Sequence, residues 1–455
     1  MKNDVKPLRE RVAPIWRFFM AGKGLSFRTG LYFGESMLVG AVTGLVVVVF
    51  RFMIDLGDRF VFHGIGGHSK WLMAALPAVG AWLGYLIIRR FSSVEHVRGT
   101  DSAIRAFHHR NGEIPGAVIP AKSVASVLTV SSGGSAGYEG PVTLLGAAVG
   151  SVTARRFGLG PRAQRILMAA GLAAGIAALF QAPLAGAIFG FEIFYSSSDV
   201  AYETLLPCFI ASVVSYTIYA YFFGWAPIFS MPPECVYDSG LRLLPYFALA
   251  IVVTFGVRFY IQVFRNVEMR FATMRLPRPA KVALGGLAVG MVGLILPDIL
   301  GAGYPVIQAS LDAGLRGMSV DASAAITWFL CFFILKVIAT SFTVGSGGSG
   351  GLFAPALACG GALGAAVGFF FERTLPAWFN IHPSAFALVG MAGFLASSIR
   401  TPITAIVMVA ELSGNHGLLL PAMWVCGISF WLNNGWSLYR SQMHRRESSP
   451  AGQKN

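Results

Sequence analysis

The stretch Val130–Pro141, V-S-S-G-G-S-A-G-Y-E-G-P, returns in the second half of the chain as Val344–Pro355, V-G-S-G-G-S-G-G-L-F-A-P. The copies align without a gap, and each continues into an apolar run of small residues. A glycine-rich turn before an apolar helix leaves backbone N–H groups unpaired at the helix N-terminus, where they can bind an anion. The prominent chemical difference is Glu139, which aligns with Phe353. We therefore expect two facing helix N-termini, with Glu139 between them.

A second pair of matching blocks extends the repeat. Gly171–Glu192 matches Gly390–Glu411, so that Glu192 aligns with Glu411 and a proline occupies the same place in each block. Two independent blocks in the same order indicate an internal duplication.

Composition indicates a polytopic membrane protein. Only 12% of the 455 residues are charged and 55% are hydrophobic, whereas a soluble domain carries about 25% charged residues. Several apolar segments are shorter than the ~20 residues that span a bilayer, and short, Gly/Pro-interrupted segments in two repeats are typical of transporter binding sites. We therefore expect an all-α membrane protein with short, tilted and broken helices. The apolar segments lie at about 36–54, 71–88, 115–130, 141–156, 163–178, 183–196, 201–223, 241–264, 281–297, 321–342, 355–372, 384–398, 402–412 and 416–436.

Basic residues indicate the orientation. The net charge of +14 comes largely from the N-terminal segment, the stretch Arg265–Lys281 and the C-terminal tail, which fits the positive-inside rule better than nucleic-acid binding. If all three are cytoplasmic, the two repeats have inverted topology; the basic loop Arg155–Arg165 stays unassigned. We expect a cytoplasmic segment 1–35 with a short amphipathic helix near residues 12–20, a first membrane repeat 36–223, an extracellular or periplasmic linker 224–240, a second repeat 241–440 and a cytoplasmic tail 441–455.

Cysteine and histidine give no sign of a metal site. The five cysteines and eight histidines are scattered, without C-x-x-C or Cys/His pairing. We expect no metal, no cofactor and no disulfide framework.

Three kinds of chemistry could use the glycine-rich loops. Phosphate binding lacks the G-K-[ST] element. A serine hydrolase would use Ser135 in a G-x-S-x-G motif, but the motif recurs around Ser349 and needs a nearby His/Asp pair. A dehydrated anion held by backbone dipoles explains both the duplication and the apolar surroundings. In that case Glu139 occupies an anion position when ionised and frees it when protonated or displaced. The alternative, a glutamate that caps its own helix, leaves Phe353 in the other copy unexplained.

The motifs resemble those of the CLC family of chloride channels and H+/Cl− antiporters. Gly137–Pro141, G-Y-E-G-P, is similar to the family's G-[RK]-E-G-P, and Gly351–Pro355 fits its G-x-F-x-P. Tyr439, in S-L-Y-R, resembles the family's pore tyrosine, and the duplicated A-P-L-A-G…E block at Ala182–Glu192 is also similar to the family. The resemblance spans about residues 36–440.

The resemblance implies a transport protein, not an enzyme. It implies a homodimer in a bacterial inner membrane, without a C-terminal regulatory domain and with both termini in the cytoplasm. One anion pathway per subunit would carry chloride, with Glu139 as the external gate. The anion site would be formed by Gly137, Gly140, Phe353, Ala354, Tyr439, Arg98, Gly99 and Thr100.

Three departures from the family pattern leave the transport mode open. The G-S-G-I-P motif is absent, and counting back from Glu139 places Val97–Asp101, V-R-G-T-D, there, with Arg98 for the pore serine and Thr100 as a nearby hydroxyl donor. Ile193 stands where proton-coupled members have an internal glutamate, and Tyr138 replaces a basic residue. We favour H+/Cl− exchange slightly, with an uncoupled chloride channel as the alternative. A fluoride exporter is disfavoured by Tyr439.

Overall fold

The computed structural model describes residues 27–65, 69–91, 99–231, 237, 240–312 and 321–450. These residues form sixteen α-helices and short 3-10 or π turns, and they contain no β-strand beyond two isolated bridges. Eight segments of this part of the chain are long and apolar enough to cross a membrane. The predicted all-α membrane fold is therefore confirmed. The amphipathic helix expected near residues 12–20, and Arg98, lie outside the described residues.

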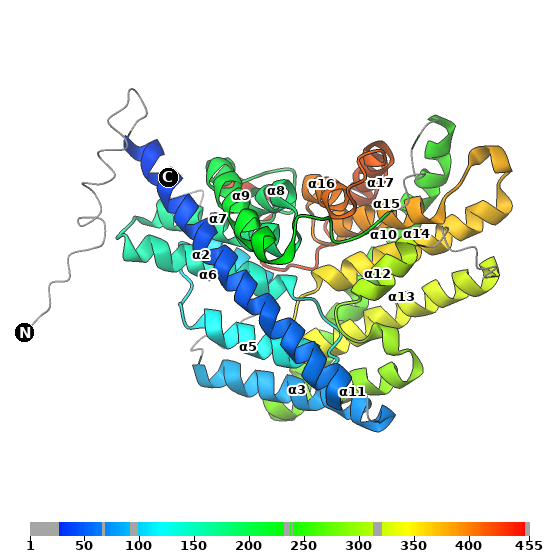
Figure 1. Ribbon diagram of the computed structural model, residues 1–455, viewed down its shortest axis with the longest axis horizontal. Coiled ribbons are helices and arrows are strands. Elements are labelled where there is room, and N and C mark those ends of the chain that lie inside the picture. The colour runs from blue at the N-terminus through cyan, green and yellow to red at the C-terminus, as the bar shows by residue number, and fades with distance from the viewer. Residues whose placement is uncertain are drawn as a thin grey trace, which may run out of the picture.

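The helices form two sets of eight, shown in order of colour in Figure 1. The first set is α2 (Phe27–Gly57), α3 (Lys70–Phe91), α4 (Thr100–His109), α5 (Val118–Ser131), α6 (Glu139–Arg156), α7 (Pro161–Leu179), α8 (Pro183–Glu192) and α9 (Leu205–Phe223). The second is α10 (Leu243–Thr273), α11 (Arg278–Ile295), α12 (Tyr304–Leu311), α13 (Ala322–Gly345), α14 (Phe353–Thr374), α15 (Pro383–Ser398), α16 (Pro402–Ser413) and α17 (Leu419–Leu432). The short turns are η1 (Asp58–Ile65), η3 (Tyr202–Thr204), η4 (Gly240–Arg242), η5 (Pro297–Ile299), η6 (Ala377–Phe379) and η7 (Arg446–Ser448).

The two sets pack in the same way. In the first, α7 contacts α2, α6, α8 and α9, and in the second, α15 contacts α10, α14, α16 and α17. Equivalent helices also meet across the centre, because α3 contacts α11, α8 contacts α16 and α6 contacts α14. The duplication read from the two sequence blocks thus extends to all sixteen helices.

A local twofold axis relates the repeats at the glycine-rich loops. Gly137 and Gly351, which are equivalent residues, form an antiparallel pair in which each N–H donates to the other carbonyl, at 2.9 and 2.7 Å. Antiparallel pairing of equivalent residues requires a twofold axis between them. Accordingly, α6 extends to the left and α14 to the right of the centre in Figure 1. The predicted inversion of the repeats is confirmed.

The loops approach so closely that glycine is required. A Cβ on Gly351 would lie 2.6 Å from the backbone nitrogen of Gly140, well inside van der Waals contact. The equivalent residues Gly133 and Gly347 have φ of 99° and 108°, a region that L side chains rarely adopt. Glycines in the repeated motif thus serve close backbone contact as well as turning.

Three helical features differ from the sequence prediction. α10 continues to Thr273, so that the basic stretch Arg265–Lys281 is mostly helical and only residues 274–277 connect α10 to α11. α4 and α12 were not predicted as segments. Both are short, with 10 and 8 residues, and α4, T-D-S-A-I-R-A-F-H-H, has no apolar run to reveal it.

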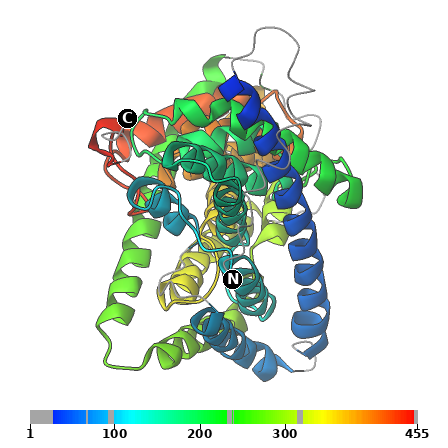
Figure 2. The ribbon, with the colours of Figure 1, turned by 90° about the vertical axis from the view of Figure 1, so that its left-hand side faces the viewer.

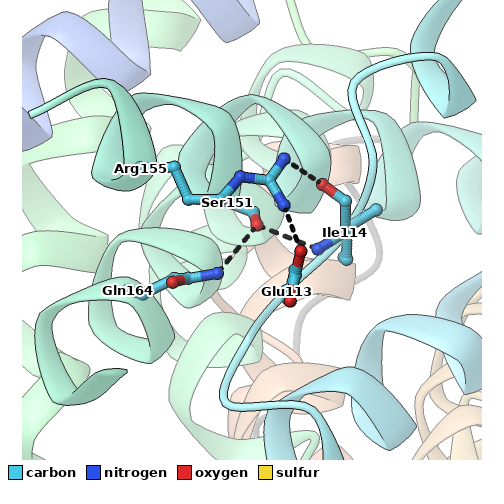
Figure 3. Close-up of polar contacts among 5 residues, drawn as sticks. All are labelled: Glu113, Ile114, Ser151, Arg155 and Gln164. Atoms are coloured by element: carbon cyan, nitrogen blue, oxygen red, sulfur yellow. Dashed lines mark hydrogen bonds and ion pairs between the residues drawn. The ribbon is translucent and has the colours of Figure 1, made fainter. Parts of the chain in front are cut away.

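The basic loop Arg155–Arg165 lies on the same face as the C-terminal segment. In Figure 3, Arg155 forms an ion pair with Glu113, at 3.0 Å, and donates a hydrogen bond to the Ile114 carbonyl. The Ile114 amide in turn donates to the Ser151 hydroxyl. Helix α4, which precedes this connection, is in turn joined to the tail, because His108 contacts Ser449 at 2.7 Å. Figure 2 views the molecule from this side, where α2 begins and the C-terminus lies. The loop therefore adds to the positive charge of one face, as the positive-inside rule expects.

Candidate functional site

The Glu139 carboxylate lies between the two repeats. Glu139 is the first residue of α6, and its side chain is fully buried. Oε2 accepts a hydrogen bond from the Ala354 amide at the start of α14 (3.3 Å), and Oε1 accepts one from the Tyr304 hydroxyl (2.5 Å). A helix N-terminus carries partial positive charge and unpaired N–H groups. The carboxylate thus takes the place of an anion at the N-terminus of the opposite repeat.

Hydroxyl groups line up on the other side of the α6 N-terminus. The Tyr439 hydroxyl is hydrogen-bonded to Thr100, whose Oγ1 lies 2.8 Å from Oγ1 of Thr143. Thr143 in turn donates to the Gly140 carbonyl at 2.7 Å. Gly99 packs against this carbonyl, since a Cβ there would lie 2.9 Å from the Gly140 oxygen. Four of the predicted site residues, Gly99, Thr100, Gly140 and Tyr439, therefore meet at one point.

A cavity of about 330 Å³ opens at these hydroxyl groups. Thr100, Gly140, Gly351 and Tyr439 line it, together with residues of the glycine-rich loop before α14. Basic side chains line it as well, and they outnumber Asp101 and Glu268: Lys122, Arg278, Lys281 and Arg440. We name this cavity the basic vestibule. Its lining suits the entry of a small anion toward Tyr439.

Phe353 and Gly137 stay predicted anion-site residues, and both also make contacts within the protein. The Phe353 ring is buried against Phe180 and Phe189, at centroid distances of 5.0 and 6.0 Å. The Gly137 amide is used in the pairing with Gly351. In this conformation Ala354 supplies the amide that faces the carboxylate.

Four further residues support the site and were not singled out from the sequence. The Tyr304 hydroxyl donates a hydrogen bond to Glu139. The Thr143 hydroxyl is hydrogen-bonded to that of Thr100. Asp101 accepts hydrogen bonds from the Ser441 amide and hydroxyl, at 2.9 and 3.0 Å, and so fixes the turn after Tyr439. Lys336 Nζ donates to the carbonyls of Ile299 and Gly301 just before α12.

Ile193 stands where an internal glutamate is expected in proton-coupled members of the family. Ile193 is fully buried, and Gln442 Nε2 donates to its carbonyl at 2.9 Å. A second cavity, of about 550 Å³, lies beside Gln442 and Tyr439 and is lined by Arg265, Arg400 and Arg440. Among the described residues that line it there is no acidic side chain.

The serines of the G-x-S-x-G motifs are paired by the twofold symmetry. Ser135 lies 3.1 Å from the Thr340 hydroxyl, and the equivalent pair, Ser126 and Ser349, is 2.8 Å apart. Both pairs are buried and join α5 and α13 to the opposite glycine-rich loop. This arrangement is structural and offers no base to activate Ser135.

Inverted repeats whose helix N-termini meet around one buried carboxylate define a membrane transport protein with its site near the centre. The chain belongs to the voltage gated chloride channel family, whose model matches residues 79–434. It is 31% identical over 400 residues to the putative chloride channel protein ClcB-like of Ralstonia nicotianae, covering 86% of this chain and 90% of that protein. It is also 31% identical over 409 residues to the H(+)/Cl(−) exchange transporter ClcA of Yersinia pestis, with coverage of 86% and 82%.

Solved structures share the fold. A CLC-type fluoride/proton antiporter superposes with a TM-score of 0.79 at 21% identity, over 92% of this chain and 100% of that one. A slow cyanobacterial Cl−/H+ antiporter gives 0.77 at 23% identity, over 91% and 97%.

Proposed function

We propose that the protein transports chloride across the membrane by H+/Cl− exchange, with Glu139 as the gate. The observation that carries the proposal is the Glu139 carboxylate at the N-terminus of α14, where it accepts the Ala354 N–H. A chloride ion can take this position when Glu139 is protonated or swings away, because the backbone dipoles that hold the carboxylate also suit a halide. The exchange transporter among the relatives supports the coupling to protons.

An uncoupled chloride channel is the second candidate. It is favoured by Ile193, a buried apolar side chain at the place of the internal proton glutamate. The arginine-lined cavity beside it disfavours a hydrated proton and favours an anion.

Flux from liposomes that contain the purified protein distinguishes the two. With a chloride gradient applied and internal pH recorded, exchange predicts proton movement against the proton gradient, in the direction opposite to chloride. Chloride flux without proton movement would establish the channel. Flux of fluoride in place of chloride would identify a fluoride exporter, and the absence of any anion flux would overturn the proposal.

A substitution of Glu139 tests its role as the gate. We expect Glu139→Gln, which keeps the shape of the side chain but not its charge, to carry chloride at a rate independent of pH and to move no protons. An intramembrane hydrolase that uses Ser135 would instead lose its activity in Ser135→Ala and keep it in Glu139→Gln.

We further propose that the protein lies in a bacterial inner membrane, with repeats at 36–223 and 241–440, an outer linker at 224–240, and cytoplasmic ends at 1–35 and 441–455. The basic face that carries Arg156 and the C-terminal segment supports this orientation. In a Cys235→Ser/Cys331→Ser background, Arg156→Cys should react with an impermeant maleimide only from the cytoplasmic side and Trp378→Cys only from the other. Labelling of both from one side would contradict it.

We also propose a homodimer. Helix α8 contacts α9 and α16, and α16 contacts α17. These four helices carry large exposed apolar side chains, among them Leu184, Leu206, Val213, Ile403, Leu420 and Trp424. A second copy would cover this face. Light scattering of the protein in detergent should give twice the mass of one chain, and a monomeric mass would contradict the proposal.

A further inference from the structure

Tyr304 makes the shortest polar contact with Glu139. Its hydroxyl donates to Oε1 at 2.5 Å, from the other repeat and from a residue 165 positions away in the chain. The two carboxylate oxygens are thereby held by different elements, Oε1 by α12 and Oε2 by the Ala354 amide of α14. Tyr304 belongs to none of the repeated motifs.

Contacts of the preceding loop and of the aromatic ring fix the position of Tyr304. Tyr304 is the first residue of α12 and follows Gly303, whose φ is 91°. The buried Lys336 donates from α13 to the carbonyls of Ile299 and Gly301, at 2.9 and 2.7 Å, in the loop that precedes α12. The Phe229 ring lies 6.0 Å from the Tyr304 ring on another side. A side chain held at its backbone and its ring can direct its hydroxyl at one acceptor.

We propose that Tyr304 is a latch for the gate: its hydroxyl holds the Glu139 carboxylate against α14 and thereby sets the pH at which the pathway opens. This inference rests on the proposed function, in which Glu139 is the gate. Tyr304 acts as a positioning residue, through the carboxylate.

The latch discriminates between the two states of Glu139. A hydrogen bond from a phenol to a carboxylate is charge-assisted and roughly twice as strong as one to a neutral acceptor. Protonation of Glu139 therefore weakens the contact with Tyr304 and releases the side chain. Without the hydroxyl, the ionised carboxylate is less stable in the closed position, so that it takes a proton and leaves at a lower proton concentration.

Other ionisable groups surround this pair and remain in place when Tyr304 is changed. Arg51 is itself paired with Asp55 at 3.0 Å. The groups that interact electrostatically with Glu139 or Tyr304 are Lys336 from α13, Arg51 from α2, Tyr219 from α9, Tyr138 before α6 and Tyr439 after α17. Cys359 of α14 interacts in the same way with Lys336, and Asp58 with Tyr138.

The test is the pH dependence of chloride flux in Tyr304→Phe, which keeps the ring and removes only the hydroxyl. We expect the midpoint of the flux-against-pH curve to move up by about one pH unit, a roughly tenfold lower proton concentration. Flux at neutral pH should rise, and flux at acid pH should match that of the natural protein. Tyr246→Phe is the matched control, since this buried tyrosine stacks on Phe386 in α15, with ring centroids 4.4 Å apart. It should leave the midpoint unchanged.

The double variant Tyr304→Phe/Glu139→Gln separates the latch from the gate. It should behave as Glu139→Gln alone, because no carboxylate remains for the hydroxyl to hold. If Glu139→Gln removes the pH dependence while Tyr304→Phe keeps the natural midpoint or lowers it, the proposed role of Tyr304 is wrong and the proposed role of Glu139 as the gate is retained. If Glu139→Gln keeps the natural pH dependence, the proposed function itself fails.

A second measurement does not depend on the stability of Tyr304→Phe. A fluorinated tyrosine introduced at position 304 has a more acidic hydroxyl and is the stronger donor. It should move the midpoint down, opposite to the effect of phenylalanine. A shift in the same direction as Tyr304→Phe would overturn the latch.

Discussion

Single side chains complete the site by joining segments that lie far apart in the chain. Asp101 stands where the family motif has proline, yet its carboxylate binds Ser441 and holds the turn that carries Tyr439. Thr100 bonds both Tyr439 and Thr143. The altered motif V-R-G-T-D therefore still presents one hydroxyl group, that of Thr100, at the start of α4, although Arg98 stands at the place of the family's serine.

His108 gives the molecule a pH-dependent stability. It lies in α4, outside the membrane-spanning segments, with Nδ1 2.7 Å from Ser449 Oγ and Nε2 2.9 Å from the Phe194 carbonyl. Burial lowers the pKa of His108 from 6.5 to about 4, against a partly opposing effect of the Phe194 hydrogen bond. Between these values the unfolded chain binds more protons, so the stabilising contribution is present above about pH 6.5 and is lost as the pH falls to about 4.

We expect the unfolding temperature of the detergent-solubilised protein to fall across this range, by an amount that corresponds to a loss on the order of 3 kcal/mol. His108→Gln should flatten that part of the curve, because glutamine does not titrate. The matched variant His416→Gln should keep it, since His416 lies between α16 and α17 and not in α4. An unchanged pH profile in His108→Gln would show that His108 is not the group responsible.

The residues of the site were predictable where a motif carried them. Glu139, Tyr439 and Thr100 follow from local patterns in the sequence. Tyr304 does not, because its partner is 165 residues away and nothing in the local sequence indicates what the hydroxyl would meet. Phe353 was predicted from its alignment with Glu139, but the neighbours that bury its ring are set by the packing of α7 and α8 on α14.

Pairs of equivalent helices cap each other across the twofold axis. Glu192, the last residue of α8, accepts the amides of Ile403 and Thr404 at the start of α16, at 3.0 and 2.8 Å. Glu411 of α16 accepts the amides of Leu184 and Ala185 at the start of α8, at 3.1 and 2.8 Å. The glutamate that ends each repeated block thus satisfies the unpaired N–H groups of its counterpart.

This reciprocity predicts a structural role for Glu192, although it adjoins Ile193. Glu192→Gln and Glu411→Gln should each destabilise the protein by about 1–3 kcal/mol. The loss should be larger for Glu192, which is buried and also accepts the Thr404 hydroxyl. Thermal unfolding measures the loss, and proton-coupled flux of the remaining folded protein should be unchanged. If Glu192→Gln abolished proton movement with normal stability, Glu192 would be the internal proton carrier instead.

Helices could be predicted from the sequence where a long apolar run marks them. The long apolar runs were found, whereas α4 and α12 were not, because each is short and is stabilised by contacts that include Asp101–Ser441 and Gln308–Ser230. α10 was predicted to end at residue 264, but its last turns lie outside the apolar run and continue as a charged helix to Thr273. Hydrophobicity marks where a helix can be in lipid, and hydrogen bonding decides where it ends.

On the scale of the whole molecule, charge is distributed to favour anions on one face. The basic vestibule joins Arg278 and Lys281 at the start of α11 to the hydroxyl groups at Thr100 and Tyr439. Arg440 also lines it and pairs with Glu268 at 3.0 Å, so part of its charge is compensated. A cleft whose lining carries an excess of positive charge raises the local concentration of anions.

Neutralising the vestibule should therefore slow chloride entry without closing the gate. We expect Arg278→Gln/Lys281→Gln to lower the initial rate of chloride flux roughly twofold to tenfold at low ionic strength, through reduced electrostatic attraction. The difference should shrink when ionic strength is raised with an impermeant anion at constant chloride, since screening acts within about 10 Å at 0.1 M salt. Arg162→Gln, on the same face but outside the vestibule lining, should change the rate little. A deficit that persists at high ionic strength would mean that these side chains act through structure, and an equal deficit in Arg162→Gln would assign the effect to the charge of the whole face.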